Sequence, residues 1–375
     1  MYRIGKDIFA MRWEKGWPRT KADRAWILFA WLIALSGCHA IPITGQVDTN
    51  AKVAANFQGT VDVHLPSATD PGPMIPVVVR RAPAGSEAAR IVIVDVDGLL
   101  LNQNLTGIYS VGENPVSAFR EKLEMAAGDP RVRGVVLRVH SPGGGVTASD
   151  ILAEELRRFR QATGKPVVAC LMDVATGGAY YLAVGSDRII ALPTSITGGI
   201  GALINHANLE DAMAQLNLRV EPVKAGELVD MGSVAAPLSD EARGLFQDMA
   251  NGFRDRFATR VAQSRPMMTV DDHRSIADGR IVAASRALKL HMVDQLGYVD
   301  DAIAEAERLA GVPGSEVVFF ERAGHPTRSI YSIVPNVPLQ SELIPFSYPG
   351  LERSKLPTFL YLWQPDPTIT KLSGR

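Results

Sequence analysis

The sequence predicts an α/β protein in which a mostly parallel sheet is covered by helices on both faces. The 375 residues are 46% hydrophobic and 21% charged, a globular composition. Several apolar runs lack polar alternation, as strands buried on both faces do. Segments with helical spacing lie between these runs, and that alternation is typical of parallel sheets. The expected strands are Ile91–Val96, Gly134–Val139, Pro166–Met172 and Arg188–Leu192, and the expected helices are Pro115–Ala127 and Thr147–Thr163.

Further elements follow the same reasoning. Ser239–Ala262 is expected to be a long amphipathic helix, because Leu245, Met249, Phe253 and Phe257 share one face. Residues 39–90 have little periodic pattern, and the many prolines and aromatics of residues 316–375 favour an irregular tail. We therefore expect a signal peptide (1–37), a linker or extended arm (38–88), an α/β domain (89–312) and a C-terminal extension (313–375).

The N-terminus has the pattern of an export signal. Basic residues precede an unbroken apolar run, Ala25–Leu35. A helix of this length would span roughly 16 Å, too short for a bilayer core of about 30 Å. The run ends in L-S-G-C (35–38), which resembles the lipobox of bacterial lipoproteins and implies cleavage before Cys38 and its lipidation. We expect an exported protein that is lipid-anchored to a cell envelope membrane. The alternative is an ordinary secretory peptide or a short anchor.

Several function classes are disfavoured. The net charge of −1 gives no overall bias toward nucleic acid. The histidines and cysteines have no zinc-ligand spacing, and Cys170 lies in an apolar run as a core residue would. The glycines at Gly143–Gly145 lack the lysine of a phosphate loop, and they lack the dinucleotide pattern G-x-G-x-x-G. We therefore expect no cofactor and no metal.

Two small-residue segments carry the most information. The first, S-P-G-G-G (141–145), follows an expected strand and predicts a glycine loop before a helix. The second, Thr176–Ala179, follows the next strand along the chain. Glycines allow backbone N–H groups to approach a reacting carbonyl closely, and each such donor stabilises an oxyanion by about 3–4 kcal/mol in well-studied enzymes. The alternative is a tight turn without chemistry.

These segments resemble the signal peptide peptidase A family, which are membrane-associated serine peptidases of the ClpP/crotonase-like fold. The resemblance covers residues 90–310, with motifs in the family's order and spacing. It implies that fold, a homo-oligomer and extended peptides as ligands. The matching stretches are R-V-H-S-P-G-G-G-V-T-A-S (138–149), D-V-A-T-G-G-A-Y-Y-L-A (173–183), D-R-I-I-A-L-P-T-S-I-T-G-G-I-G (187–201), V-K-A-G-E-L-V-D-M-G-S (223–233) and a stretch at 277–303.

The family's two chemical positions are altered in this chain. The family uses a serine nucleophile and a neutral lysine that takes its proton. Alignment without gaps places Gly177 at the serine and Val229 at the lysine. Neither residue can perform that chemistry. The resemblance still implies an oxyanion hole formed by the backbone of Gly143, Gly144 and Gly178.

Other registers and residues offer alternatives. Sliding the motif by one residue makes Thr176 the nucleophile, with Lys224 as the nearest candidate base. The favoured interpretation of Thr176 is instead a helix N-cap or a packing role. His140 stands at the end of an expected strand, where it is either a base or a satisfied core histidine.

Three functions are therefore considered. The first is a degenerate, lipid-anchored peptidase homologue that retains a peptide-binding groove and acts as a binding or scaffold protein. The second is an active serine/threonine-type endopeptidase that cleaves membrane-associated signal peptides. The third, a crotonase-type acyl-thioester enzyme, is disfavoured by export. The long helix and the tail aromatics Phe359, Tyr361 and Trp363 are expected oligomer contacts, while His39 mildly favours an outer membrane if the cell has one.

Overall fold

The computed structural model describes residues 51–53, 61–63, 72–83, 89–103, 105–107, 110–322, 329–331 and 359–363. The predicted signal peptide and the lipidation site at Cys38 lie outside these residues. The chain divides into two units, Met1–Pro66 and Ser67–Arg375. In the first unit, β1 (Ala51–Val53) pairs antiparallel with β2 (Val61–Val63). All that follows concerns the second unit.

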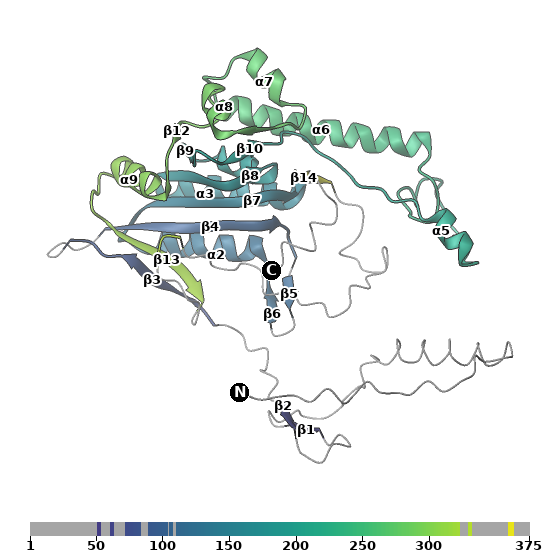
Figure 1. The fold of residues 1–375 in the computed structure, drawn as a ribbon, viewed down its shortest axis with the longest axis horizontal. Helices are drawn as coiled ribbons and strands as arrows, with labels where there is room; N and C mark the ends of the chain where they lie inside the picture. The colour runs from purple at the N-terminus through teal and green to yellow at the C-terminus, as the bar shows by residue number, and fades with distance from the viewer. Residues whose placement is uncertain are drawn as a thin grey trace, which may run out of the picture. The chain divides into compact units, whose positions relative to one another are not determined.

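The second unit contains a ten-stranded sheet in its described part (Figure 1). Its main path runs β11-β10-β8-β7-β4-β13-β3, with β9 and β14 pairing off this path with β8 and β7, and β12 with β9. The central neighbours are parallel, whereas β3, β11 and β14 join antiparallel. The strands are β3 (Met74–Arg80), β4 (Arg90–Leu100), β7 (Val132–Gly145), β8 (Val167–Thr176), β9 (Arg188–Ala191), β10 (Ile196–Gly198), β11 (Ile281–Ala283), β12 (Gln295–Leu296), β13 (Glu316–Arg322) and β14 (Leu360–Leu362). A separate antiparallel pair joins β5 (Leu105–Gly107) and β6 (Ser110–Glu113).

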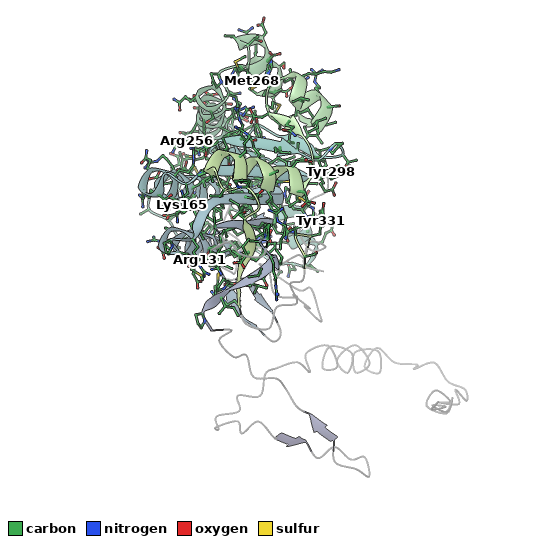
Figure 2. All side chains as sticks on the ribbon, turned by 90° about the vertical axis from the view of Figure 1, so that its left-hand side faces the viewer. Arg131, Lys165, Arg256, Met268, Tyr298 and Tyr331 are labelled. Carbon is green, nitrogen blue, oxygen red and sulfur yellow. The ribbon has the colours of Figure 1, made fainter. Side chains whose placement is uncertain are left out.

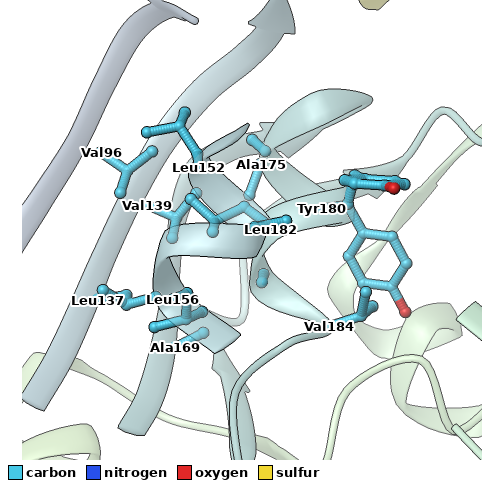
Figure 3. Close-up of a cluster of buried hydrophobic side chains, with 14 of the residues drawn as sticks. Val96, Leu137, Val139, Leu152, Leu156, Ala169, Ala175, Tyr180, Leu182 and Val184 are labelled. Carbon is cyan, nitrogen blue, oxygen red and sulfur yellow. The ribbon is translucent and has the colours of Figure 1, made fainter. Parts of the chain in front are cut away.

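Helices cover both faces of the sheet. Alternate residues of a strand point to opposite faces. Leu137 and Val139 of β7 therefore pack in one core with Leu152 and Leu156 of α3 (Figure 3), while Val136 packs in a second core with α9. The predicted α/β class with a mostly parallel sheet is confirmed. The helices are α2 (Pro115–Gly128), α3 (Val146–Thr163), α4 (Gly178–Ala183), α5 (Glu210–Gln215), α6 (Asp240–Ser264), α7 (Val270–Ile276), α8 (Ala284–Lys289) and α9 (Val299–Ala310).

The sheet extends beyond the predicted domain boundaries of 89–312. On the N-terminal side, β3 belongs to the segment that was expected to be a linker. On the C-terminal side, β13 inserts between β4 and β3, and its Val317–Phe320 stretch is buried. The expectation of an irregular tail is therefore wrong for 316–322, because four consecutive apolar residues fill a place buried on both faces of the sheet.

The long helix α6 begins just after its N-cap Ser239, whose hydroxyl accepts from the Ala242 backbone N–H at 3.2 Å. Its C-terminal half packs on the sheet unit through the buried Phe257 and Val261. In its N-terminal half, Leu245 and Met249 are exposed, so the predicted apolar face is buried only in part. Residues 204–239, called the projection below, extend away from the sheet before α6 (Figure 1). Among the described residues, no helix has the length and apolar character needed to cross a bilayer.

Candidate functional site

The glycine run Gly143–Gly145 is the end of a strand, not the loop that the sequence predicts. After Ser141, β8 leaves β7, and the C-terminal strand β14 takes its place beside β7. Leu360, Tyr361 and Leu362 of β14 pair with Gly145, Gly144 and Gly143. On the other side, β4 still pairs with β7 through Leu99–Gly143 and Leu100–Gly144. The glycines are needed because backbone approaches them closely: a Cβ on Gly144 would lie 2.1 Å from the Leu100 carbonyl oxygen.

The structure brings the three glycines of the predicted oxyanion hole together. The Gly178 backbone nitrogen lies 2.8 Å from where a Cβ on Gly143 would stand, and a Cβ on Gly178 would lie 3.5 Å from the Gly144 nitrogen. A carbonyl group already occupies this place. The Tyr361 oxygen lies 2.0 Å from the Cβ position of Gly143. The three backbone segments therefore form a cradle around a peptide carbonyl that belongs to the chain's own β14.

Gly177, the position aligned with the family's serine, faces the same carbonyl. A Cβ at Gly177 would lie 2.3 Å from the Tyr361 oxygen and 2.7 Å from its carbonyl carbon, distances that real Cβ atoms do not adopt. Its φ is +54°, a conformation that side-chain-bearing residues rarely adopt. The Gly177 N–H donates to the Gly198 carbonyl at 2.9 Å, which fixes the turn. With the β14 segment in place, this position accepts only glycine.

Thr176, the alternative nucleophile, is fully buried. Its hydroxyl donates to the Pro142 carbonyl at 3.1 Å and so ties the end of β8 to β7. The N-cap of α4 is Gly177, which makes no side-chain cap, so the predicted capping role of Thr176 is wrong. The hydroxyl instead satisfies a backbone carbonyl where the two strands separate.

Lys224, the candidate base, and Val229, which aligns with the family's lysine, lie together in the projection. Val229 is 68% exposed. Lys224 donates to the Asp230 carboxylate at 2.7 Å and to the Glu227 carbonyl at 3.0 Å. The hydrogen bond from Lys224 lowers the pKa of Asp230. The hydrogen bonds and ion pairs described for residues 223–233 all stay within the projection, so none of them brings Lys224 or Val229 to Gly177.

An aromatic wall encloses the side chains of β14. The fully buried Tyr361 ring lies 5.3 Å from Tyr181 and 5.0 Å from Phe257, centroid to centroid. Its hydroxyl donates to the Phe253 carbonyl at 2.6 Å, and burial raises its pKa. Phe359 lies 5.0 Å from the Phe253 ring. The expectation that Phe359 and Tyr361 form an oligomer surface thus misses their place inside this site. The sequence feature that could have predicted a strand here is the short apolar run F-L-Y-L-W at 359–363.

Charged groups behind the wall hold Tyr181 in place. Its hydroxyl donates to the Asp150 carboxylate at 2.6 Å, and Arg256 also donates to Asp150, at 2.9 Å. The Arg260 guanidinium lies 4.8 Å from the centre of the Tyr181 ring, a cation–π distance. Burial lowers the pKa of Arg260 and raises that of Tyr181. Tyr181 therefore has a fixed orientation toward Tyr361.

A hollow with a volume of about 410 Å³ is lined by side chains of β4, β7 and β8, among them Asp97, His140 and Met172. His140 lines it and is exposed, with its Nδ1 3.4 Å from the Asp97 carboxylate, so it is not the satisfied core histidine that the sequence offers as one interpretation. Burial raises the pKa of Asp97. Within the described ranges, no cluster of three or more histidine, cysteine or acidic side chains is arranged to hold a metal ion. Cys170 is buried, and burial raises the pKa of its thiol to about 12.

Comparisons with known proteins match the sequence of this chain to a class of proteases. The model of "Peptidase family S49" matches residues 159–313, which include Gly177 and Val229. The chain is 30% identical to "Putative signal peptide peptidase SppA" of Enterococcus faecium over 63% of this chain and 68% of that protein. It is 33% identical to "Putative protease MJ0651" of Methanocaldococcus jannaschii over 56% and 67% of the two chains. It is 28% identical to "Protease 4" of Salmonella typhi over 75% of this chain but only 42% of that protein.

The fold and these matches define a protein of the serine-peptidase class with a mostly parallel α/β sheet. The chain belongs to peptidase family S49, the signal peptide peptidase A family.

Proposed function

We propose that this chain is a non-cutting member of family S49, which binds extended peptide segments at the Gly143–Gly145 end of β7. The observation that carries the proposal is Gly177. It has no hydroxyl, and a peptide carbonyl lies where a side chain would begin, 2.3 Å from the Cβ position. The aligned base position, Val229, cannot accept a proton. What remains is a strand end that holds a peptide through backbone pairing, the mode known as β-augmentation.

The remaining hydroxyls near the cradle support the same proposal. Thr176 donates to Pro142, and Ser149 donates to the Gly145 carbonyl at 2.9 Å. Ser141 accepts from the Gly143 N–H at 3.0 Å. An activated nucleophile needs a base that takes its proton, whereas the Thr176 and Ser149 protons point to backbone carbonyls. The cradle therefore retains the backbone groups that bind a peptide but has no activated nucleophile.

The sequence patterns support proposals on the fold type, the location and the assembly of the protein. We infer a ClpP/crotonase-like fold, export with lipid anchoring at Cys38, and a homo-oligomer. Anchoring is tested by metabolic labelling with a radioactive fatty acid. The full-length chain is expected to incorporate label and the Cys38→Ser variant to lose it. Equal labelling of both would contradict the anchor at Cys38.

The test of the central proposal is hydrolysis. The full-length protein is incubated with a fluorophosphonate probe and with a panel of unstructured peptides, followed by mass spectrometry. We expect no covalent adduct and no cleavage, and the Thr176→Val variant should behave identically. Labelling or turnover that disappears in Thr176→Val would instead establish an active threonine peptidase.

A further inference from the structure

The strand β14 is held in the groove from both sides by backbone hydrogen bonds. Toward β7, the Val146 N–H donates to the Phe359 carbonyl at 3.0 Å, and the Trp363 N–H donates to the Pro142 carbonyl at 3.1 Å. On the opposite side, Leu360 and Leu203 exchange both bonds, at 2.9 and 3.1 Å. Alternate residues therefore bond to opposite walls, as in the middle strand of an antiparallel sheet. This part of the binding does not depend on which side chains the segment carries.

Side chains at alternate positions supply the selectivity. Phe359 and Tyr361 stand two residues apart, so they point to the same side of the strand. Both meet rings of α6: Phe359 lies 5.0 Å from Phe253, and Tyr361 lies 5.0 Å from Phe257. The Tyr361 hydroxyl also has a fixed acceptor, the Phe253 carbonyl at 2.6 Å. A segment with an aromatic residue, any residue and then a tyrosine fits these two places.

Glycine at residue 177 leaves room for the backbone of the Tyr361 segment. The Tyr361 carbonyl enters a space bounded by Gly143 and Gly177, where the Cβ positions lie 2.0 and 2.3 Å from its oxygen. A serine at residue 177 would displace the segment by its Cβ alone. Glycine in place of serine at residue 177 thus removes the nucleophile and also leaves space for a peptide carbonyl in the cradle.

We propose that the groove is a recognition site for extended segments of the pattern aromatic-x-Tyr, and that the chain's own Phe359–Trp363 is its resident ligand. This inference rests on the proposed function, a groove that binds and does not cut. The resident segment fills the groove, so an outside peptide of the same pattern binds by displacing it. The partner is therefore a protein or peptide that offers such a segment in extended form.

A disulfide between Leu203→Cys and Leu360→Cys, in a Cys38→Ser background, tests whether the Phe359–Trp363 segment occupies the groove of its own chain. Directly opposed, hydrogen-bonded residues have Cα atoms about 5.5 Å apart, which a disulfide spans. Mild oxidation of the full chain should give a link within one chain, identified by mass spectrometry. The pair Leu203→Cys with Tyr331→Cys is the matched control and should not link. No link for the first pair, or a link only between two copies, would overturn the assignment.

Selectivity is tested with a fluorescent synthetic peptide that has the sequence of residues 357–365, by anisotropy. Tyr361→Ala in the full chain loosens the resident segment, so this variant should bind the peptide at least tenfold more tightly than the unchanged chain. Tyr361→Phe, which keeps the ring, should be intermediate. The control is Tyr331→Ala, a tyrosine 52% exposed at the surface of the unit (Figure 2), which should leave binding unchanged.

A second peptide, with alanine in place of its tyrosine, should bind the Tyr361→Ala chain at least tenfold more weakly. Equal affinity of both peptides, or equal binding by the Tyr361→Ala and unchanged chains, would overturn the proposed ligand pattern. Peptide mass after incubation separates the two proposals. A cleaved peptide overturns the non-cutting function and leaves the recognition pattern intact. An intact peptide that binds without selectivity overturns the recognition pattern and leaves the non-cutting function intact.

Discussion

The strand end around Gly177 and the projection around Val229 hold the two positions that the family uses for chemistry, and their surroundings are opposite. Every residue from Thr176 to Ala183 is buried, and backbone from three strands meets there. Val229 is 68% exposed, in a loop whose described polar contacts are local. The contrast teaches that the first replacement is coupled to the packing of the fold. The second changes only a surface side chain.

The largest expected effect is at Gly144, where the strand end leaves no room on the β4 side. In Gly144→Ala, the new Cβ would meet the Leu100 carbonyl oxygen at 2.1 Å and its nitrogen at 2.6 Å. Two paired backbones cannot separate cheaply, so we expect a loss of about 3 kcal/mol or more in the free energy of unfolding. Urea denaturation measures it. The control Gly252→Ala, on an open face of α6, should be neutral or more stable by up to about 1 kcal/mol. Similar values for both variants would contradict the close packing.

Gly177→Ala should have the next largest effect, and part of it should act through β14. The alanine would adopt a φ of +54° and would meet the Tyr361 carbonyl oxygen at 2.3 Å. Strained backbone of this kind costs about 1–3 kcal/mol, and the segment must also shift. We therefore expect lower stability in urea and slower formation of the Leu203–Leu360 disulfide. Gly244→Ala, with open space around it, is the matched control. An unchanged disulfide rate would show that β14 does not depend on Gly177.

Val229→Lys tests the opposite region and should do almost nothing to stability. The side chain is exposed, and substitutions at such sites stay within about 0.5 kcal/mol. Without a nucleophile at Gly177, the added amine should also give no hydrolysis of the peptide panel. A clear change in the free energy of unfolding would show that Val229 is packed against another surface in solution, such as a second copy of the chain.

The same contrast explains what the sequence could predict. The central strands and α2, α3 and α6 follow local apolar patterns, so their starts could be predicted to within about two residues, whereas β4, β7 and β8 continue beyond their predicted ends at Val96, Val139 and Met172. The cradle glycines could be located from their spacing. The place of β14 could not, because its partners Gly144 and Leu203 lie more than 150 residues away in the sequence. The strand β13 could not be placed for the same reason. Only its pairing with β4 and β3, which are distant in the sequence, makes this short apolar run a central strand.

The smallest expected effect concerns two carboxylates, Asp97 in the hollow beside His140 and Asp230 in the projection, whose pKa values move in opposite directions. Burial raises the pKa of Asp97 in the hollow, and the Lys224 hydrogen bond lowers that of Asp230 in the projection. A raised pKa in the folded state means that stability falls as pH rises from the unfolded pKa, about 4, through the folded value. A lowered pKa means that stability is present above about pH 4 and is lost as pH falls through the folded value.

Asp97→Asn should therefore gain stability relative to the unchanged chain as pH rises above about 4, because only the unchanged chain must ionise a buried carboxyl. Asp230→Asn should be less stable than the unchanged chain above about pH 4, and this deficit should shrink as pH falls below about 4. Thermal unfolding of both variants and the unchanged chain from about pH 2 to 7 measures the two slopes. Asp230 should give the shallower slope, because exposed ion pairs contribute little. Two slopes of the same sign would contradict the difference in burial between the hollow and the projection. Opposite signs would show that the sheet and the projection differ in electrostatics as well as in packing.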